Sequence, residues 1–364
     1  MSNNILFILP FYSLGGAETQ AFNIALTLKE KGYKVSFFAF EKKNGKLIEK
    51  LEEHHIFWKL STFNLHSIHK PGLKKLFDLF KVVKEVRSFS PDFLMPFTYY
   101  PNIVISSIWK LTGAKKCFWN QRGLEHNGFS IVEKIAKKMK PEYIGNSKAC
   151  TNYIENRHHL KKDSLQVIHN GIKLILPKND TNYWIKLTQK EEGELIYTMV
   201  ANFYPEKNHF FLLEAWKKFT ENHLDKKLKL VLIGYSPSEH HFNKIETFAF
   251  DHQITNILFL PSTNDVAGLL KVSDYGLLTS SSEGCPNSVL EYMLNQKLAI
   301  ISKIPANEEI FPENYPFFCD LGDSNTLVNC FENSLNHSLV EKSVKENYQL
   351  VVEKFNMKSL VDKY

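Results

Sequence analysis

Residues 275–293 read Tyr-Gly-Leu-Leu-Thr-Ser-Ser-Ser-Glu-Gly-Cys-Pro-Asn-Ser-Val-Leu-Glu-Tyr-Met, and the fold class can be inferred from them. Its apolar start, residues 275–278, predicts a buried parallel strand. Pro286 stands at a typical first position of a helix, so residues 284–288 should form a strand-to-helix turn with outward-facing backbone N–H groups. Such a turn binds anions, phosphate above all, because the unpaired N–H groups and the helix dipole both favour negative charge.

Two carboxylates flank this turn, Glu283 just before it and Glu291 one helical turn inside the expected helix. Carboxylates are poor ligands for phosphate but good hydrogen-bond acceptors for sugar hydroxyls. A phosphate cradle between two such acceptors suits a nucleoside diphosphate-sugar. For the pair alone, the alternative is an ordinary strand–helix corner with two surface glutamates.

Composition bounds the class of protein. The 364 residues are enough for two domains with separate cores. The five cysteines form no Cys-x-x-Cys pair and no zinc-like spacing, which indicates reduced thiols in a cytosolic protein. No apolar run reaches the roughly 20 residues of a membrane span, and the first residues read as a strand rather than a signal peptide. We therefore expect a cytoplasmic protein.

Charge is divided unevenly between the two halves of the chain. Residues 1–180 hold 28 Lys and Arg against 15 Asp and Glu, a net +13, whereas residues 181–364 hold 17 against 24, a net −7. This asymmetry suggests that the basic half meets an anionic surface. No nucleic-acid-binding motif is present, so we expect a peripheral position on an anionic inner-membrane leaflet and no nucleic acid as partner.

The first half reads as a doubly wound α/β domain. A short apolar strand (residues 5–10) runs into the turn Ser-Leu-Gly-Gly-Ala-Glu (residues 13–18), then a helix and a second strand (residues 33–40). The turn lacks the Gly-x-Gly-x-x-Gly fingerprint of dinucleotide sites. Gly15 and Gly16 either let a ligand approach the backbone closely or simply form a tight turn.

Residues 73–89 predict an amphipathic helix with an apolar stripe and a basic back. One interpretation is a helix that packs on the core and leaves its basic back in water. The other is docking on an anionic membrane, which basic amphipathic helices favour. A second basic cluster, at residues 134–140, weakly supports docking.

Active sites of open α/β sheets lie beyond the carboxyl ends of strands, so strand ends supply further candidates. The strand at residues 92–96 leads to Tyr99, Tyr100 and Asn102, which are plausible cleft residues.

The strand at residues 116–120 leads to Arg122, whose guanidinium suits phosphate or carboxylate recognition. Glu125 and His126 follow and could supply acid–base or dipole stabilisation, although a surface histidine is the commoner case.

The second half repeats the α/β pattern after a polar linker at residues 172–193. Strands are predicted at residues 195–201, 228–234, 257–260 and 298–302, and a helix at residues 339–363.

These motifs carry a resemblance. Residues 283–291, Glu-Gly-x-Pro-Asn-x-x-Leu-Glu, resemble the donor-site signature of the family 4 glycosyltransferases, which are retaining enzymes of the GT-B fold. Residues 15–18, Gly-Gly-Ala-Glu, are similar to the glycine loop that this family places against donor phosphate and acceptor. Asn170-Gly171 looks like its passage towards the second domain.

The resemblance implies an α/β GT-B protein with two Rossmann-like, doubly wound parallel-sheet domains facing a cleft. Residues 1–180 would bind the acceptor and residues 181–345 the nucleotide-sugar. Residues 346–364 would form a helix that packs back on the first domain. The implied reaction is the transfer of a sugar, with retention, from a nucleotide-sugar to a glycan or lipid-linked acceptor. A UDP-sugar is the favoured donor. A composition rich in Lys, Asn and Phe hints at an AT-rich bacterial genome and hence at surface polysaccharide synthesis.

The resemblance also implies roles. Glu283 would contact sugar hydroxyls, Glu291 would accept from the ribose, and backbone N–H groups around Asn287 would hold the diphosphate together with Lys207. The family has an arginine shortly before this lysine, and Asn202 stands in its place, which removes one charge. Arg122 could then help, and the nucleotide base would lie near Pro261.

The predicted residues fall into three groups. The donor-binding residues are Gly15, Gly16, Asn202, Lys207, Pro261, Glu283, Gly284, Cys285, Pro286, Asn287, Ser288, Val289 and Glu291. The acceptor-binding residues are Glu18, Tyr99, Tyr100, Asn102 and Glu125. The catalytic residues are Glu283, Lys207, His126 and Arg122.

No metal and no other cofactor is expected, because the chain has no Asp-x-Asp motif to hold a metal against a diphosphate. Two alternative functions stay open. A GT-B sugar-nucleotide epimerase would need no lipid acceptor and no basic face, and the charge asymmetry argues against it. A catalytically silent sugar-nucleotide-binding scaffold would bind donor without turnover.

Overall fold

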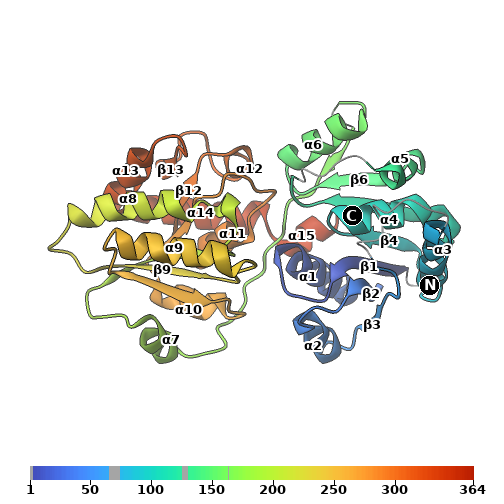
Figure 1. The fold of residues 1–364 in the computed structure, drawn as a ribbon, viewed down its shortest axis with the longest axis horizontal. Helices are drawn as coiled ribbons and strands as arrows, with labels where there is room; N and C mark the ends of the chain where they lie inside the picture. The colour runs from blue at the N-terminus through green and yellow to red at the C-terminus, as the bar shows by residue number, and fades with distance from the viewer. Residues whose placement is uncertain (1–2, 65–73, 125–129, 163) are drawn as a thin grey trace. The chain divides into compact units, whose positions relative to one another are not determined.

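The computed structural model describes residues 3–64, 74–124, 130–162 and 164–364. The chain divides into two compact units (Figure 1). Unit 1 comprises Met1–Gly171 and Met357–Tyr364, and unit 2 comprises Ile172–Asn356. Two predicted site residues, Glu125 and His126, lie outside the described residues.

Unit 1 is a parallel sheet of seven strands in the order β3-β2-β1-β4-β5-β6-β7. The strands are β1 (Asn4–Phe11), β2 (Lys34–Glu41), β3 (Phe57–Leu60), β4 (Phe93–Pro96), β5 (Lys116–Gln121), β6 (Glu142–Gly145) and β7 (Gln166–Val167). The helices are α1 (Gly16–Glu30), α2 (Lys46–Glu53), α3 (Lys74–Arg87), α4 (Tyr99–Ile108), the 3₁₀ helix η2 (Trp109–Leu111), α5 (Ile131–Lys138), α6 (Lys148–His158) and α15 (Met357–Val361).

Strand β1 is apolar along most of its length because both faces of the sheet are covered. Ile5, Phe7 and Leu9 pack into one core cluster with residues of α1. Leu6 and Ile8 point the other way, into a second cluster with residues of α3 and α4. The continuous apolar run in the sequence therefore reports a central strand.

Helix α3 settles how the basic amphipathic segment packs. Leu79, Val82 and Val86 are buried in the core, whereas Lys81 and Lys84 are exposed. The prediction of a core-facing helix is confirmed, and the basic back of α3 lies on the surface.

Unit 2 is a parallel sheet of six strands in the order β10-β9-β8-β11-β12-β13. The strands are β8 (Leu195–Val200), β9 (Leu228–Gly234), β10 (Ile257–Pro261), β11 (Tyr275–Leu278), β12 (Leu298–Ser302) and β13 (Phe318–Cys319). The helices are α7 (Thr181–Thr188), the 3₁₀ helix η3 (Pro205–Lys207), α8 (His209–Glu221), α9 (Glu239–Asp251), α10 (Val266–Val272), α11 (Asn287–Leu294), α12 (Pro305–Glu308), α13 (Ser324–Ser334) and α14 (His337–Lys354).

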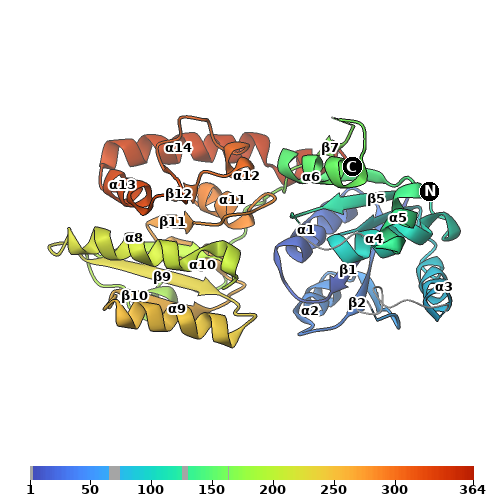
Figure 2. The same ribbon diagram turned by 45° about the horizontal axis from the view of Figure 1, so that its top comes forward.

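Helix α11 is seated on the sheet by a glycine and a tyrosine. It packs on β11 and β12, and α14 packs on α11 (Figure 2). A Cβ on Gly276 would lie 2.3 Å from the Tyr292 ring, so only glycine permits this approach. The Tyr292 hydroxyl donates to the Leu277 carbonyl at 3.1 Å and accepts from the Val200 N–H at 2.8 Å. The helix is thereby fixed to both β11 and β8.

The strand orders define a topological switch point in each sheet. In unit 2 the chain places β9 and β10 on one side of β8, and β11, β12 and β13 on the other. In unit 1 the corresponding switch lies between β1 and β4. Ligands of open α/β sheets bind beyond the carboxyl ends of the strands at such points.

The boundary between the units differs from the predicted one. It lies at Gly171 and Ile172 rather than at residue 180, because the predicted linker holds helix α7, which packs on α10. Buried Trp184 donates from Nε1 to Asp265 Oδ2 at 2.9 Å.

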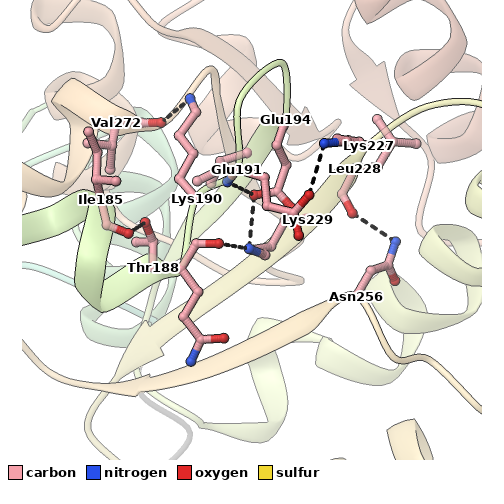
Figure 3. Close-up of polar contacts among 12 residues, drawn as sticks. Ile185, Thr188, Lys190, Glu191, Glu194, Lys227, Leu228, Lys229, Asn256 and Val272 are labelled. Carbon is pink, nitrogen blue, oxygen red and sulfur yellow. Dashed lines mark hydrogen bonds and ion pairs between the residues drawn. The ribbon is translucent and has the colours of Figure 1, made fainter.

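The loop after α7 is also tied to unit 2, at the amino ends of β8 and β9 (Figure 3). Lys227 pairs with Glu191 at 3.0 Å, and Lys229 pairs with Glu194 at 2.9 Å. Lys190 Nζ donates to the Val272 carbonyl at 2.7 Å. These contacts lie at the edge of the sheet opposite the switch-point loops, so this polar cluster is structural.

The helix predicted at residues 339–363 is interrupted. Helix α14 ends at Lys354, and the Phe355 carbonyl accepts from the Ile172 N–H at 2.8 Å. Only residues 357–364, which we call the returning segment, belong to unit 1, whereas residues 346–356 belong to unit 2. Within unit 1, α15 packs on α1, and Met357 lies so close to Gly171 that a Cβ there would be 2.8 Å from its Sδ.

Candidate functional site

The loops that follow β8 and β11 meet at the switch point of unit 2. The Lys207 ammonium forms an ion pair with the Glu283 carboxylate, and both side chains are largely buried. The Thr279 hydroxyl donates to the Lys207 carbonyl at 2.9 Å, and Asn208 Nδ2 donates to the Thr279 carbonyl at 3.1 Å. Two predicted catalytic residues that are far apart in the sequence are thus in direct contact.

The turn between Glu283 and α11 presents a helix N-terminus at the same place. Pro286 is the residue that precedes the helix, with φ −73°, and its side chain makes no capping hydrogen bond to the first turn. Pro286 was predicted to be the first residue of the helix. It instead precedes the helix, because its backbone is extended (ψ 118°) and the helix begins at Asn287. A helix N-terminus favours an anion such as phosphate.

Several residues of this turn act as scaffold. Gly284 is buried, and the side chains of Cys285 and Val289 lie in the core cluster of unit 2. Cys285 and Val289 therefore hold the turn against the sheet. Only their backbone groups could contact a ligand. Ser288 is half-buried in the first turn of the helix.

Glu291 differs from Glu283 in having no protein partner. Its side chain is half-buried, and within the described part of the chain its carboxyl makes no hydrogen bond or ion pair. Burial raises the pKa of the Glu291 carboxyl to about 7. Burying a polar group without a partner is costly, so the site is suited to a ligand that donates hydrogen bonds to it.

The outer part of the same edge holds Asn202 and Pro261. Asn202 Oδ1 accepts from the Tyr235 N–H at 3.0 Å and so joins the loops after β8 and β9. Gly234 makes this junction possible, because a Cβ there would lie 2.0 Å from the Ala201 carbonyl oxygen. Pro261 ends β10 in register with Gly234 and is exposed. Asn202 has a loop-joining role and cannot replace the charge of an arginine.

In unit 1, the glycine loop lies at the switch point after β1. Gly15 caps α1 without a side-chain hydrogen bond, and Gly16 is the first helical residue. The Glu18 carboxyl folds back over this loop, since a Cβ on Gly15 would be 2.5 Å from Glu18 Oε2. Glu18 is buried, and burial raises the pKa of its carboxyl to about 7.

The predicted cleft residues after β4 do not all point outward. The Tyr99 ring is buried, and its hydroxyl donates to Glu133 at 3.0 Å. Asn102 is also buried, where it donates to the Asn120 carbonyl at 2.8 Å and accepts from the Asn120 N–H at 3.0 Å. Both side chains hold α4 to its neighbours, so the expectation that they face a ligand is wrong. Tyr100 is half-buried and packs edge-on against Tyr99.

Arg122 is engaged by the protein itself. Its guanidinium lies 4.6 Å above the Phe97 ring and donates to Asn170 Oδ1 at 3.0 Å and to Asn120 Oδ1 at 3.1 Å. A further bond of 2.5 Å goes to the hydroxyl of Tyr364, in the returning segment. The residue ties three parts of unit 1 together, which leaves few donors for a phosphate.

Comparison with known proteins identifies the family. The model of the glycosyl transferases group 1 matches residues 180–351, and that of glycosyltransferase family 4 matches residues 14–175. The chain belongs to the group 1 glycosyltransferases of the GT-B fold.

Two relatives of this glycosyltransferase are bacterial proteins with informative names. The Escherichia coli UDP-Gal:alpha-D-GlcNAc-diphosphoundecaprenol alpha-1,3-galactosyltransferase is 26% identical over 210 residues, which are 55% of this chain and 52% of that protein. The match therefore spans about half of that relative. The Staphylococcus aureus capsular polysaccharide biosynthesis glycosyltransferase CapH is 21% identical over 84% of this chain and 83% of its own.

The fold agrees with solved structures. Anabaena HepE, solved in complex with UDP and glucose, superposes with a TM-score of 0.81 at 18% identity, over 99% of this chain and 98% of that one. No helix in the described part of the glycosyltransferase is long and apolar enough to span a bilayer.

Sequence reasoning missed His209, which lies close to Lys207. The imidazole is buried and stacks on Phe203 at 4.8 Å, and within the described residues neither ring nitrogen has a hydrogen-bond partner. Burial lowers its pKa to about 3, with His241 and Lys207 adding to the effect, so the ring is neutral. Its position directly after Lys207 and Asn208 is the sequence feature that could have indicated a place near the site.

Thr98 is a second residue that the sequence did not single out. It stands at the switch point of unit 1 with φ 70° and ψ 173°, a region that is essentially reserved for glycine. Such strain gathers at functional sites of proteins. A β-branched residue gives no sequence signal for this conformation, which the packing of β4 and α4 imposes.

Proposed function

We propose that this glycosyltransferase moves a sugar from a nucleotide-sugar, with a UDP-sugar as donor, to a glycan or lipid-linked acceptor with retention at the anomeric carbon. The proposal rests on the meeting of Lys207, Glu283 and the N-terminus of α11 at one switch point. Glu291 lies one turn away, and its carboxyl has no partner among the described residues. Support for the donor comes from HepE, which was solved with UDP and glucose, and from a relative named for UDP-Gal.

The leaving diphosphate is the group that this arrangement serves. The bond from the anomeric carbon to the diphosphate oxygen breaks, and its electron pair leaves with the diphosphate. A bond to the acceptor oxygen forms on the same face, and the acceptor hydroxyl gives its proton to the departing phosphate oxygen. The N-terminus of α11 and the Lys207 ammonium stabilise the negative charge that develops. The Glu283 carboxylate, released from Lys207 by the phosphate, accepts hydrogen bonds from sugar hydroxyls. These groups would make the reaction independent of a metal ion.

The acceptor side is proposed to lie on unit 1, at an anionic membrane surface. Exposed lysines on the back of α3 and on α5 support this, among them Lys81, Lys84 and Lys134. One relative is named for an undecaprenol-linked acceptor and another for capsular polysaccharide biosynthesis. The protein would work on the cytoplasmic face.

Calorimetric titration with UDP, GDP and ADP tests the donor site, first without metal and then with Mg²⁺. We expect UDP to bind without metal, and Glu291→Ala to weaken binding about tenfold or more, because ribose hydroxyls lose a charged acceptor. Glu246→Ala, an exposed carboxylate on α9, is the matched control. If no nucleotide binds, the donor site at residues 283–291 is refuted.

Nucleotide affinity is also expected to depend on pH through Glu291. The pKa of its carboxyl is about 7, so the ionised form, the better acceptor, dominates at pH 8 and is minor at pH 6. The UDP dissociation constant should rise by up to about tenfold between pH 8 and pH 6. Glu291→Gln should lose this component and keep only the titration of UDP itself. Equal pH slopes in wild type and Glu291→Gln would contradict the assignment.

A further inference from the structure

A cavity of about 240 Å³ lies in unit 1, at the amino ends of β1, β4 and β5. Its floor is formed by Ile5, Met95 and Phe118, one from each of these neighbouring strands, and all three side chains are buried. Because the strands are parallel, this edge is opposite the one that carries the glycine loop and Arg122. The cavity therefore lies away from the glycine loop, although one of its lining residues, Tyr364, reaches Arg122 through its hydroxyl.

The returning segment forms one wall of the cavity. Val361 and Tyr364 line it from that side, and Leu28 and Tyr33 line it from the end of α1 and the residues after it. Helices α15 and α1 pack side by side here (Figure 1). Aromatic rings and aliphatic side chains thus surround the cavity, which is larger than the engineered apolar cavity of about 150 Å³ that holds benzene.

The mouth of the cavity carries charge. Lys31 and Asp362, both at the rim, form an ion pair that joins α1 to the returning segment. Lys116, also at the rim, pairs with Glu142 at 2.9 Å. All four side chains are a third exposed or more, and ion pairs this exposed contribute little to stability. A ligand carboxylate can therefore recruit either ammonium group at little cost.

We propose that this cavity binds a small aromatic carboxylate, with its ring system against Phe118 and Tyr364 and its carboxylate at Lys31 and Lys116. The shape, the apolar floor and the two rim cations together select an amphipathic anion over a neutral aromatic compound. The site is independent of the proposed sugar transfer. Its ligand would fasten the returning segment to the sheet and touch Tyr364, whose hydroxyl holds Arg122.

The test uses the full chain and two probes of equal shape, 2-naphthoate and neutral 2-naphthalenemethanol. Calorimetry should show one naphthoate per chain, bound at least tenfold more tightly than the alcohol, and naphthoate should raise Tm. Lys116→Met should weaken naphthoate severalfold without affecting the alcohol. Asp362→Asn should tighten naphthoate, because Lys31 is released from its partner. Lys110→Met, at an exposed lysine elsewhere on unit 1, should change the affinity of neither probe.

Two further measurements keep the location of the site open to refutation. Leu28→Trp, which fills the cavity, should abolish naphthoate binding, and its Tm without ligand reports whether the chain still folds. UDP should not displace naphthoate, since the donor site lies in unit 2. Absence of naphthoate binding, displacement by UDP, or unchanged binding in Leu28→Trp would each overturn the proposal, and none of these results bears on sugar transfer.

Discussion

Substitution of Lys207 by alanine is expected to reduce kcat for sugar transfer by about 10²- to 10³-fold or more. Removal of one preorganised donor from an oxyanion site has an effect of this size, and Lys207 carries a full charge. The loss should exceed that from Glu291→Ala, because the ribose is bound equally in ground and transition states whereas the charge on the leaving diphosphate grows. Steady-state assays with a saturating UDP-sugar measure kcat directly.

The ion pair with Glu283 sharpens this test. Lys207→Met leaves the Glu283 carboxylate largely buried and unpaired beside the diphosphate, so UDP affinity should fall further than in the double variant Lys207→Met with Glu283→Gln. Lys217→Ala, a partly exposed lysine on α8, is the matched control and should retain wild-type kcat. If Lys207→Ala stays within about threefold of wild type, Lys207 has no role in catalysis.

Loss of the Glu133 carboxylate is expected to destabilise unit 1 by about 3–5 kcal/mol. This fully buried group accepts from Arg157 Nε at 2.6 Å and from Tyr99 at 3.0 Å, and lies 2.9 Å from His158 Nε2. Glu133→Gln removes from this buried ionic network the carboxylate with which Arg157 forms its ion pair, while the charge of Arg157 stays in place. Urea unfolding of Glu133→Gln at pH 7 measures the cost.

The Glu133 carboxylate should also make the stability of the protein depend on pH. Burial alone would raise the pKa of the Glu133 carboxyl, but hydrogen bonds from His158 and Arg157 outweigh it and hold the pKa at about 2. Since this is below the unfolded value of about 4.3, the contribution is present above about pH 4.3 and lost as pH falls towards 2. Wild type and Glu133→Gln should therefore converge in acid. Glu142→Gln, which removes an exposed ion pair, should lower the free energy of unfolding by no more than about 1 kcal/mol. An equal loss of stability in Glu133→Gln and Glu142→Gln would contradict this account.

Local pattern was sufficient to predict the frame of the molecule. The apolar run at residues 275–278, the small residues after it and the helix former beyond them specify strand, turn and helix with few long-range contacts, and the structure has β11 and α11 there. The apolar run also predicted that this strand is buried and parallel, and β11 pairs in parallel with β8 and β12. The family signature at residues 283–291 consists of residue types at fixed, short spacing. It could therefore also be recognised without knowledge of long-range contacts.

Side-chain direction at the strand ends needed the tertiary structure. Tyr99 and Asn102 stand where a ligand site was expected, yet Glu133 and Asn120, from other elements, turn them into the core. Arg122 is held by Asn170 and by Tyr364, which lies at the far end of the sequence.

The two α/β units, and the turn whose backbone N–H groups are offered to an anion, could be predicted from sequence because hydrophobic period and turn chemistry are local. Three features follow from the folded chain instead: Lys207 pairs with Glu283, Glu291 has no partner among the described residues, and α14 ends where Phe355 meets Ile172. Each of these three features depends on which groups from distant parts of the chain reach one hydrogen-bonding atom. Local sequence pattern contains no information about those distant groups.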